Sequence, residues 1–321
     1  MKTHKLSRRA ALSRTGAIMG ITLAGQYLKA APASPETPAT KRGEPFLFCL
    51  NTATIRGQKL GLVKEIEIAA QAGYQGIEPW ISSIEDYTKG GGSLKDVKKR
   101  LDDLGLSVES AIGFSQWLVD DDAKRAQGLE RAKYELDLVA QLGGKRLAAP
   151  PAGATDTPGL DLLKAADRYR ALLELGDQSG VAPQLELWGF SKSFYRLGQC
   201  VCTAIETGHP KACVLADIYH LYKGGSDFHG LKLLAENTVQ VLHVNDYPND
   251  APRDQINDSF RVYPGDGSGP VVEILRVLHA TGGRKVLSLE VFNRKYWEQD
   301  PLEVARTGLE KMKAVARKAL G

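Results

Sequence analysis

Lys285-Val-Leu-Ser-Leu-Glu290 is a short apolar stretch that ends on a carboxylate. Continuous apolar runs of this length are typical of strands buried in a parallel sheet. The same pattern occurs three times upstream, in Gln184-Leu-Glu186, Val214-Leu-Ala-Asp217 and Val241-Leu-His243. Four strands therefore end on a carboxylate or an imidazole, which predicts one shared site.

The chain from Pro45 onward alternates strand-like and helix-like runs, and eight such pairs can be counted. The expected strands cover residues 46–50, 76–80, 106–111 and 146–149, and then the four stretches quoted above. The expected helices cover residues 59–72, 93–104, 123–142, 160–178, 194–207, 230–237, 271–281 and 302–320. Such alternation requires parallel strands with helical crossovers.

Eight units in about 275 residues predict a single α/β domain, a (β/α)8 TIM barrel over residues 45–321. An open, doubly wound sheet is the alternative fold. That fold favours a glycine-rich phosphate loop after the first strand, and residues 51–57 do not form one. The irregular segment 247–270 follows the seventh strand, so we expect it to cover or line the site.

The first 44 residues differ in kind from the rest. Basic Lys2, Lys5 and Ser7-Arg8-Arg9 precede a mostly apolar stretch, and small residues follow around Ala31. This layout predicts a cleavable export signal of the twin-arginine type over residues 1–31 and a spacer over 32–44. We therefore expect a periplasmic or otherwise exported protein.

The charge of the chain is concentrated in this N-terminal region. Residues 1–42 hold eight Lys or Arg and one Glu, a net of +7, whereas the whole chain carries +4. The remainder therefore carries about −3, which gives no electrostatic reason to expect nucleic-acid binding. No apolar run reaches the roughly 18 residues of a spanning helix, so stable membrane insertion is not expected. Homo-oligomerisation is left open.

The four cysteines are Cys49, Cys200, Cys202 and Cys213. The Cys200–Cys202 spacing does not match a zinc knuckle, and burial as small apolar residues is the favoured interpretation. An oxidising compartment would also allow a disulfide to Cys213.

Side chains at the C-terminal ends of barrel strands converge on one rim. Glu186, Asp217, His243 and Glu290 would thus place three carboxylates beside one imidazole, and the carboxylates would repel one another without a cation. Oxygen-rich ligation with one histidine suits one Mn²⁺, Co²⁺ or Mg²⁺ ion, with Zn²⁺ left as an alternative.

Several motifs resemble the xylose-isomerase-like superfamily of sugar isomerases, ketose 3-epimerases, inosose dehydratases and endonuclease-IV-type nucleases. They are Gly76-Ile-Glu78, Leu185-Glu186, Asp217-Ile-Tyr-His220, His243-Val-Asn-Asp246, Pro264-Gly-Asp-Gly267 and Leu289-Glu290. The resemblance spans essentially all of residues 45–321. It implies that Glu186, Asp217, His243 and Glu290 bind the metal and that Glu186 and Glu290 form an acid/base pair.

The nuclease branch is disfavoured by the residues that differ. The resemblance implies additional histidines in nucleases, including an Asp-x-His step where this chain has Asp258-Ser-Phe260. The chain has only six histidines. A DNA-repair role is therefore not expected.

The remaining candidate residues point to a small carbohydrate substrate. His220 is expected to hydrogen-bond a substrate oxygen or to orient a ligand. Indole faces stack on sugars, and tryptophans follow three of the expected strands. The predicted substrate-binding residues are Glu78, Trp80, Trp117, Trp188 and Arg253, with Arg261 as a second candidate arginine in the same loop.

The first functional hypothesis is a metal-dependent enzyme that removes a proton beside a sugar carbonyl and then isomerises or epimerises the sugar. The second keeps this step but ends in elimination, as in a 3-keto-glycoside 1,2-lyase or an inosose-dehydratase-like enzyme. Export favours this second outcome, because glycosides are met outside the cytoplasm. The third hypothesis is a sugar-binding barrel without catalysis.

Overall fold

Eight parallel strands form the centre of the protein in a computed structural model that describes residues 44–321. The predicted export signal and nearly all of the spacer lie outside these residues. The strands are β1 (Phe46–Asn51), β2 (Gly76–Glu78), β3 (Ser107–Val108), β4 (Arg146–Ala149), β5 (Ala182–Glu186), β6 (Val214–Asp217), β7 (Val241–Val244) and β8 (Lys285–Leu289). They confirm the eight strands expected from the sequence.

The sheet curls so that its two ends meet. Its strand order is β3-β2-β1-β8-β7-β6-β5-β4, and every pair of strands is parallel. Ala111 lies just beyond β3. Its N–H donates to the carbonyl of Arg146, and its carbonyl accepts from the N–H of Ala148. These two backbone bonds join β3 to β4, which confirms the predicted (β/α)8 barrel.

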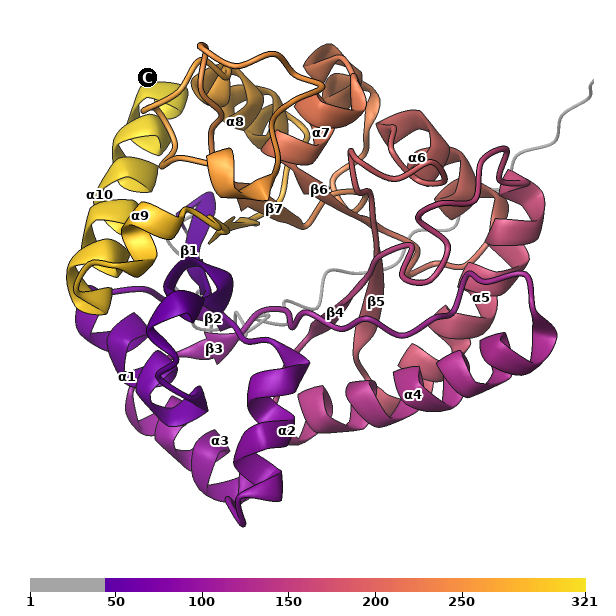
Figure 1. The fold of residues 1–321 in the computed structure, drawn as a ribbon, viewed down its shortest axis with the longest axis horizontal. Coiled ribbons are helices and arrows are strands. Elements are labelled where there is room, and N and C mark those ends of the chain that lie inside the picture. The colour runs from indigo at the N-terminus through magenta and orange to yellow at the C-terminus, as the bar shows by residue number, and fades with distance from the viewer. Residues whose placement is uncertain (1–43) are drawn as a thin grey trace, which may run out of the picture. The chain divides into compact units, whose positions relative to one another are not determined.

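Helices surround the strands as an outer layer (Figure 1). They are α1 (Leu62–Ala72), α2 (Ile81–Lys89), α3 (Leu94–Asp103), α4 (Asp122–Gln141), α5 (Leu162–Ser179), α6 (Leu197–Glu206), α7 (Ile218–Gly224), α8 (Val271–Ala280), α9 (Arg294–Trp297) and α10 (Pro301–Leu320). Three 3₁₀ segments accompany them, at Thr52–Gln58, Phe228–Leu233 and Asp258–Phe260.

Three helices, α2, α7 and α9, were not expected from the sequence. Helix α2 was not expected; it begins directly after Trp80 with no side-chain cap, and its serines and threonine are weak helix formers. In place of the α-helix expected at residues 230–237, the 3₁₀ segment Phe228–Leu233 covers its first part, and the additional helix α7 starts directly after β6. Asp217 causes this early start, because its side chain accepts a hydrogen bond from the N–H of His220 and so caps the helix.

The apolar core has two parts. The larger part fills the space between strands and helices. The smaller part lies inside the barrel and consists of Leu47, Cys49, Ile112, Ala148, Leu215, Val241 and Val286, with Trp80 packed against it. Cys49, Cys200 and Cys213 are buried free thiols and Cys202 is half-buried, which confirms packing rather than a disulfide.

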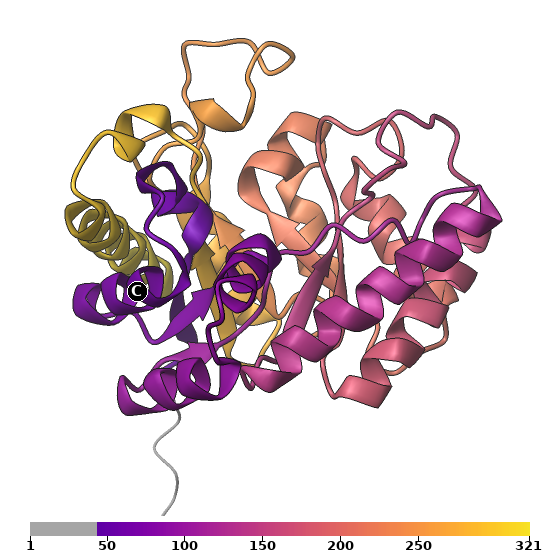
Figure 2. The same ribbon diagram turned by 60° about the horizontal axis from the view of Figure 1, so that its bottom comes forward.

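The segment after β7 rises above the C-terminal ends of the strands (Figure 2). It returns to the barrel where the backbone of Val262 pairs with that of Asp246. The Asp246 carboxylate also accepts hydrogen bonds from the N–H groups of Gly265, Gly267 and Gly269. Within residues 44–321, no helix combines the length and the apolar character needed to cross a membrane.

Glu65 generates a test of the packing between α1 and its neighbours. Its side chain is 4% exposed, its Oε2 has no hydrogen-bond partner, and burial raises its pKa to about 7. A carboxyl whose pKa is raised by folding loses stability as the pH rises from its unfolded value through about 7. We expect Glu65→Gln to stabilise the protein at pH 8 by on the order of 3 kcal/mol and to have little effect near pH 4.5.

Urea unfolding at a series of pH values measures this difference. Glu67→Gln is the matched control, because the neighbouring Glu67 carboxylate pairs with Arg100 on the surface. A gain from Glu65→Gln that did not change with pH would contradict the prediction.

Candidate active site

The strand register points four polar side chains into the mouth of the barrel. Asp217 pairs with His243 across β6 and β7. Glu186 pairs with Leu215, two residues before Asp217, and His243 pairs with Ser288, two residues before Glu290. Side chains alternate along a strand, so offsets of two keep all four on the inner face. The site therefore follows from the stagger of the barrel.

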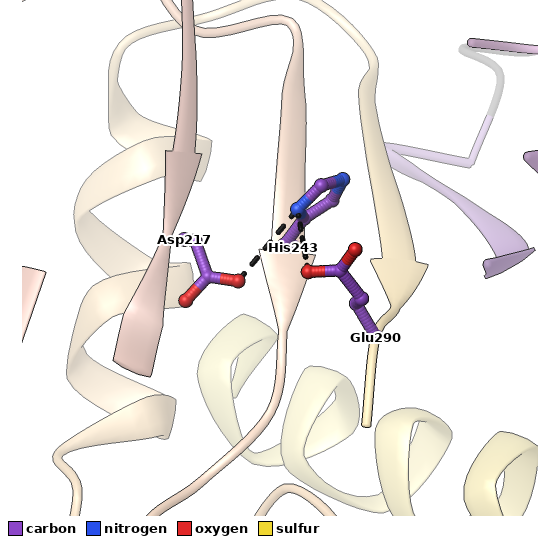
Figure 3. Close-up of side chains that lie close together, drawn as sticks. All are labelled: Asp217, His243 and Glu290. Carbon is purple, nitrogen blue, oxygen red and sulfur yellow. Dashed lines mark ion pairs between the residues drawn. The ribbon is translucent and has the colours of Figure 1, made fainter. Parts of the chain in front are cut away.

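The imidazole of His243 is the centre of this group. Its Nδ1 lies 3.1 Å from Glu290 Oε2, 3.6 Å from Asp217 Oδ2 and 3.9 Å from Glu186 Oε1. Figure 3 shows Asp217, His243 and Glu290 converging from the ends of three neighbouring strands. All four side chains are buried. The structure thus brings three of the four predicted metal ligands, Asp217, His243 and Glu290, into one set of donor atoms that lie within 4.8 Å of one another. It places the fourth, Glu186, beside this set without making it a member.

Glu78 determines which nitrogen of His243 faces the carboxylates. Its Oε2 lies 3.0 Å from His243 Nε2 and also accepts from Ser288 and Asn51. A proton on Nε2 leaves the Nδ1 lone pair directed at the site. Glu78 is fully buried and does not line the cavity, so the predicted contact with substrate is corrected to a positioning role.

Two asparagines hold the carboxylates in place. Asn51 Nδ2 donates to Glu290 Oε1 at 3.1 Å, and its Oδ1 accepts from the indole N–H of Trp80. Asn245 Nδ2 donates to Asp217 Oδ2 at 3.0 Å. Both were missed from the sequence, although Asn51 ends β1 and Asn245 directly follows β7. A polar residue at each strand end was the available signal.

Arg261 supplies the positive charge inside this group. Its Nη1 donates to Asp217 Oδ2 and to Glu290 Oε2, each at 2.8 Å, and its Nη2 donates to Asp258 at 2.6 Å. The side chain is 1% exposed. Of the two candidate arginines, the structure brings Arg261 into the site. It leaves Arg253 on the surface, outside the cavity lining.

The carboxyl groups differ in their electrostatic environment. Burial alone would raise the pKa of Asp217, but Arg261, His220 and His243 together outweigh it and hold that pKa far below its usual range. Burial raises the pKa of Glu186 to about 8; His243 opposes this rise, and Glu290 and Asp217 add to it. Glu186 is therefore protonated more easily than Asp217.

Unpaired buried atoms provide a test of whether a metal fits. Glu186 Oε2 is buried and has no hydrogen-bond partner. The lone pair on His243 Nδ1 faces a carboxylate oxygen of Glu290 at 3.1 Å, which has no proton to donate to it. Buried polar atoms normally find partners, and one oxygen each from Asp217 and Glu290 lies within 4.8 Å of Nδ1 and of the other. This oxygen-rich set with one imidazole fits a divalent cation. Nη1 of Arg261 donates to Asp217 Oδ2 and Glu290 Oε2, the same two oxygens that lie 3.6 and 3.1 Å from His243 Nδ1.

A cavity of about 200 Å³ opens beside these residues. Its polar lining comprises Glu186, His220, Asp258, Arg261 and Glu290. Its apolar lining comprises Trp80, Ile112, Phe114, Trp188, Phe190 and Phe292. The predicted substrate-binding residues Trp80 and Trp188 and the predicted catalytic residues Glu186, His220 and Glu290 thus meet at one cavity. The three phenylalanines were missed.

Trp117 lies elsewhere, contrary to expectation. Its indole is fully buried, donates to the carbonyl of Pro150, and packs against Tyr169 and Phe194. It belongs to the core between strands and helices. No face of this ring is available to a sugar in the cavity.

His220 has a donor on each side. The backbone N–H of Gly189 donates to Nδ1 at 3.2 Å, and Nη2 of Arg261 lies 3.0 Å from Nε2. Burial lowers the pKa of His220, which favours the neutral ring. A neutral imidazole has one proton and one lone pair, so it accepts from one of these neighbours and presents a proton to the other.

Comparison with known proteins agrees with this geometry. Residues 66–315 match the model of the xylose isomerase-like TIM barrel family. The chain belongs to that family. The expected family membership is therefore confirmed.

The relatives are enzymes of several reaction types. A 3-dehydroshikimate dehydratase from Pseudomonas aeruginosa is 27% identical over 234 residues, which cover 72% of this chain and 36% of that enzyme. An inosose isomerase from Bacillus velezensis is 24% identical over 84% of this chain and 97% of its own length. The chain thus spans only about a third of the dehydratase.

Solved structures agree on the fold. The crystal structure of the IolI protein with a bound zinc atom has a TM-score of 0.79 at 21% identity and covers 85% of this chain and 99% of its own. D-psicose 3-epimerase, solved in the presence of D-fructose, has a TM-score of 0.69 at 18% identity and covers 84% and 99%. At these identities the likeness establishes the barrel alone.

The two loop arginines provide a matched pair of variants. Arg261→Met removes the guanidinium from two buried carboxylates, and we expect it to lower the free energy of unfolding by about 3–5 kcal/mol without added divalent ions. Arg253→Met changes an exposed residue of the same loop, so the expected change is within about 0.5 kcal/mol. Urea unfolding of both variants measures this, and equal effects would contradict the assigned positions.

Proposed function

We propose that the protein is a divalent-metal-dependent enzyme that isomerises or epimerises a small sugar by moving a proton beside its carbonyl. One observation carries this proposal. Glu186, which has one buried carboxylate oxygen without a partner, lines the same cavity as the donor pair of His220 and Arg261. An acceptor for a proton and donors for an oxygen are what this reaction needs.

Glu186, Asp217, His243 and Glu290 are the residues that would hold the metal. When bound, such an ion polarises a carbonyl and acidifies the neighbouring C–H. Asn51, Glu78 and Asn245 already orient three of these four side chains. The manganese, cobalt or magnesium preference expected from the donor set stays part of this proposal.

Glu186 takes the proton in this scheme, at Oε2. Glu290 accepts from Asn51 at one oxygen and from Arg261 at the other, so its carboxylate is held in one orientation. Glu290 returns a proton to the substrate only after one of these bonds opens and the freed oxygen has taken up a proton from solvent. The two residues of the acid/base pair implied by the resemblance thus differ: Glu186 has an oxygen free to accept a proton, whereas both oxygens of Glu290 already accept hydrogen bonds.

His220 and Arg261 orient the substrate oxygen. With Gly189 donating to Nδ1, the His220 proton resides on Nε2 and faces the Arg261 guanidinium. Two donors that face each other are satisfied when an oxygen accepts from both. A carbonyl or alkoxide oxygen of the substrate supplies that acceptor, and the charge that develops on it is stabilised by the guanidinium.

Elimination is the second candidate function. It shares the first proton transfer, and its support is the dehydratase similarity together with the export signal expected in residues 1–31. We propose the periplasm as the compartment on the same sequence pattern. Release of the aglycone from a 3-keto-glucoside distinguishes a lyase from an epimerase, which leaves the glycosidic bond intact.

Proton transfer is tested at Glu186. We expect Glu186→Gln to slow exchange of the substrate α-proton with solvent deuterium by at least about 100-fold, since a general base contributes that much or more. NMR in deuterated buffer measures the exchange. Glu130→Gln, on the exposed face of α4, is the control. Unchanged exchange in Glu186→Gln would remove this residue from the role of base, and a barrel that only binds sugar would show no exchange at all.

Metal binding is tested without turnover. After chelator treatment, calorimetric titration with Mn²⁺, Co²⁺ or Mg²⁺ should show one site per chain, and His243→Ala should weaken it by about 10-fold or more. His229→Ala, at an exposed histidine, should leave it unchanged. Chelation should also abolish activity, and full activity in chelator would refute metal dependence.

A further inference from the structure

We propose that Phe114 and Phe190, together with Trp188, form a second subsite that binds a neutral, apolar-faced ring attached to the reacting sugar. This inference rests on the proposed function, because it assumes that a sugar occupies the inner cavity. It adds the substrate class: a glycoside or a disaccharide rather than a free or phosphorylated monosaccharide.

The aromatic rings form a continuous series from the cavity to its rim. The ring centroids of Trp80 and Phe114 lie 5.1 Å apart, and those of Phe114 and Trp188 lie 6.0 Å apart. Trp188 stacks on Phe190 at 5.3 Å, and Phe190 lies 5.8 Å from the ring of His220. These spacings are those of aromatic pairs in contact. The series therefore connects the rim directly to the predicted catalytic residues.

The outer two rings are unusually exposed for phenylalanine. Phe114 is 40% and Phe190 is 50% exposed, whereas Trp80 and Trp188 are half-buried. Exposed aromatic rings beside a cavity mark surfaces that bind a ligand. Their position is continuous with the cavity, so the ligand that covers them is the outer part of the same substrate.

The rim around Phe190 is held in place by hydrogen bonds. The N–H of Trp188 donates to the carbonyl of Phe194, and the N–H of Ser191 donates back to Trp188. Lys192 N–H reaches the carbonyl of Thr155, and the hydroxyl groups of Ser191 and Ser193 lie 2.8 Å apart. A preorganised surface loses less freedom when it binds. The loop that carries Phe190 is thus fixed in position before a ligand binds.

The size of the cavity limits what it can enclose. Its volume of about 200 Å³ lies below the usual range of roughly 300–1,000 Å³ for sites that bury a drug-sized ligand. Such a volume encloses about one sugar ring. A second ring must then extend beyond it, against the exposed faces of Phe114 and Phe190 at the outer part of the lining.

The charge of the lining indicates a neutral ligand. Three lining residues are acidic, Glu186, Asp258 and Glu290. Arg261 is the one Lys or Arg among the described residues of the lining, and its guanidinium already pairs with Asp217, Asp258 and Glu290. Arg56 stacks over Trp80 but does not line the cavity. Apart from the proposed metal, a phosphate or carboxylate would meet no Lys or Arg among the described lining residues that lacks a carboxylate partner.

Binding of unreactive glycosides tests the subsite apart from catalysis. The probes are methyl β-glucoside, phenyl β-glucoside and cellobiose, titrated by calorimetry into the metal-loaded wild-type protein. We expect the phenyl glucoside to bind about 10-fold more tightly than the methyl glucoside, since ring stacking adds to apolar burial. Tight cellobiose binding would identify the outer ring as a sugar, and weak cellobiose binding would identify it as an aryl group.

Variants locate the effect. Phe114→Ala and Phe190→Ala should each bring the phenyl-to-methyl affinity ratio close to one, and Phe190→Leu should retain part of it. Tyr134→Ala is the matched control, because Tyr134 is 43% exposed on α4 and lies outside the cavity lining. Phenyl β-glucuronide, which adds a carboxylate, should bind more weakly than phenyl β-glucoside.

Equal affinity for the methyl and phenyl glucosides in the wild type would overturn the subsite, as would an unchanged ratio in both alanine variants or binding of neither glucoside. These readouts do not depend on turnover. A failure of deuterium exchange with an intact affinity ratio would refute the proposed reaction and leave the subsite standing. Normal exchange with equal affinity for the two glucosides would refute the subsite and leave the proposed reaction standing.

Discussion

Three buried carboxylates around one imidazole nitrogen are the constraint on which the site depends. Burying several negative charges together is unfavourable unless positive charge compensates them. Arg261 provides part of that charge through direct bonds to Asp217 and Glu290. The Nδ1 atom of His243 and one oxygen each of Asp217 and Glu290 lie within 4.8 Å of one another, and Glu186 lies beside them. The arrangement therefore suits a cation held between these three side chains, with Glu186 adjacent to it.

A second layer of residues holds the side chains of this group in fixed orientations. Glu78 fixes the nitrogen that His243 presents, and Asn51 and Asn245 orient Glu290 and Asp217. Asn51 also holds the indole of Trp80, so the polar site and the aromatic lining share one hydrogen-bonded residue. The carboxylate group and the aromatic lining of the cavity are thus positioned by the same side chain, that of Asn51.

The loop after β7 contributes the guanidinium of Arg261, which is distant in sequence from the Asp217 and Glu290 carboxylates that it contacts. Asp246 ties its return to the barrel through the glycine-rich turn, and the pairing of Asp246 with Val262 places Arg261 beside the strand ends. The same segment projects above the strand ends (Figure 2), and its residues Asp258 and Arg261 line the cavity, so its position sets part of the charge balance of the site. This is consistent with the catalytic role of such loops in other barrels.

The sequence alone determined the barrel and the four converging polar side chains, because apolar strands with polar ends repeat at a readable period and barrel geometry brings their ends together. It did not separate Arg261 from Arg253, which lie in the same polar loop, nor Trp80 from Trp117. It also placed Glu78 against the substrate. Only the tertiary structure decided these cases, because inward direction and burial depend on strand stagger and loop path, which leave no local pattern.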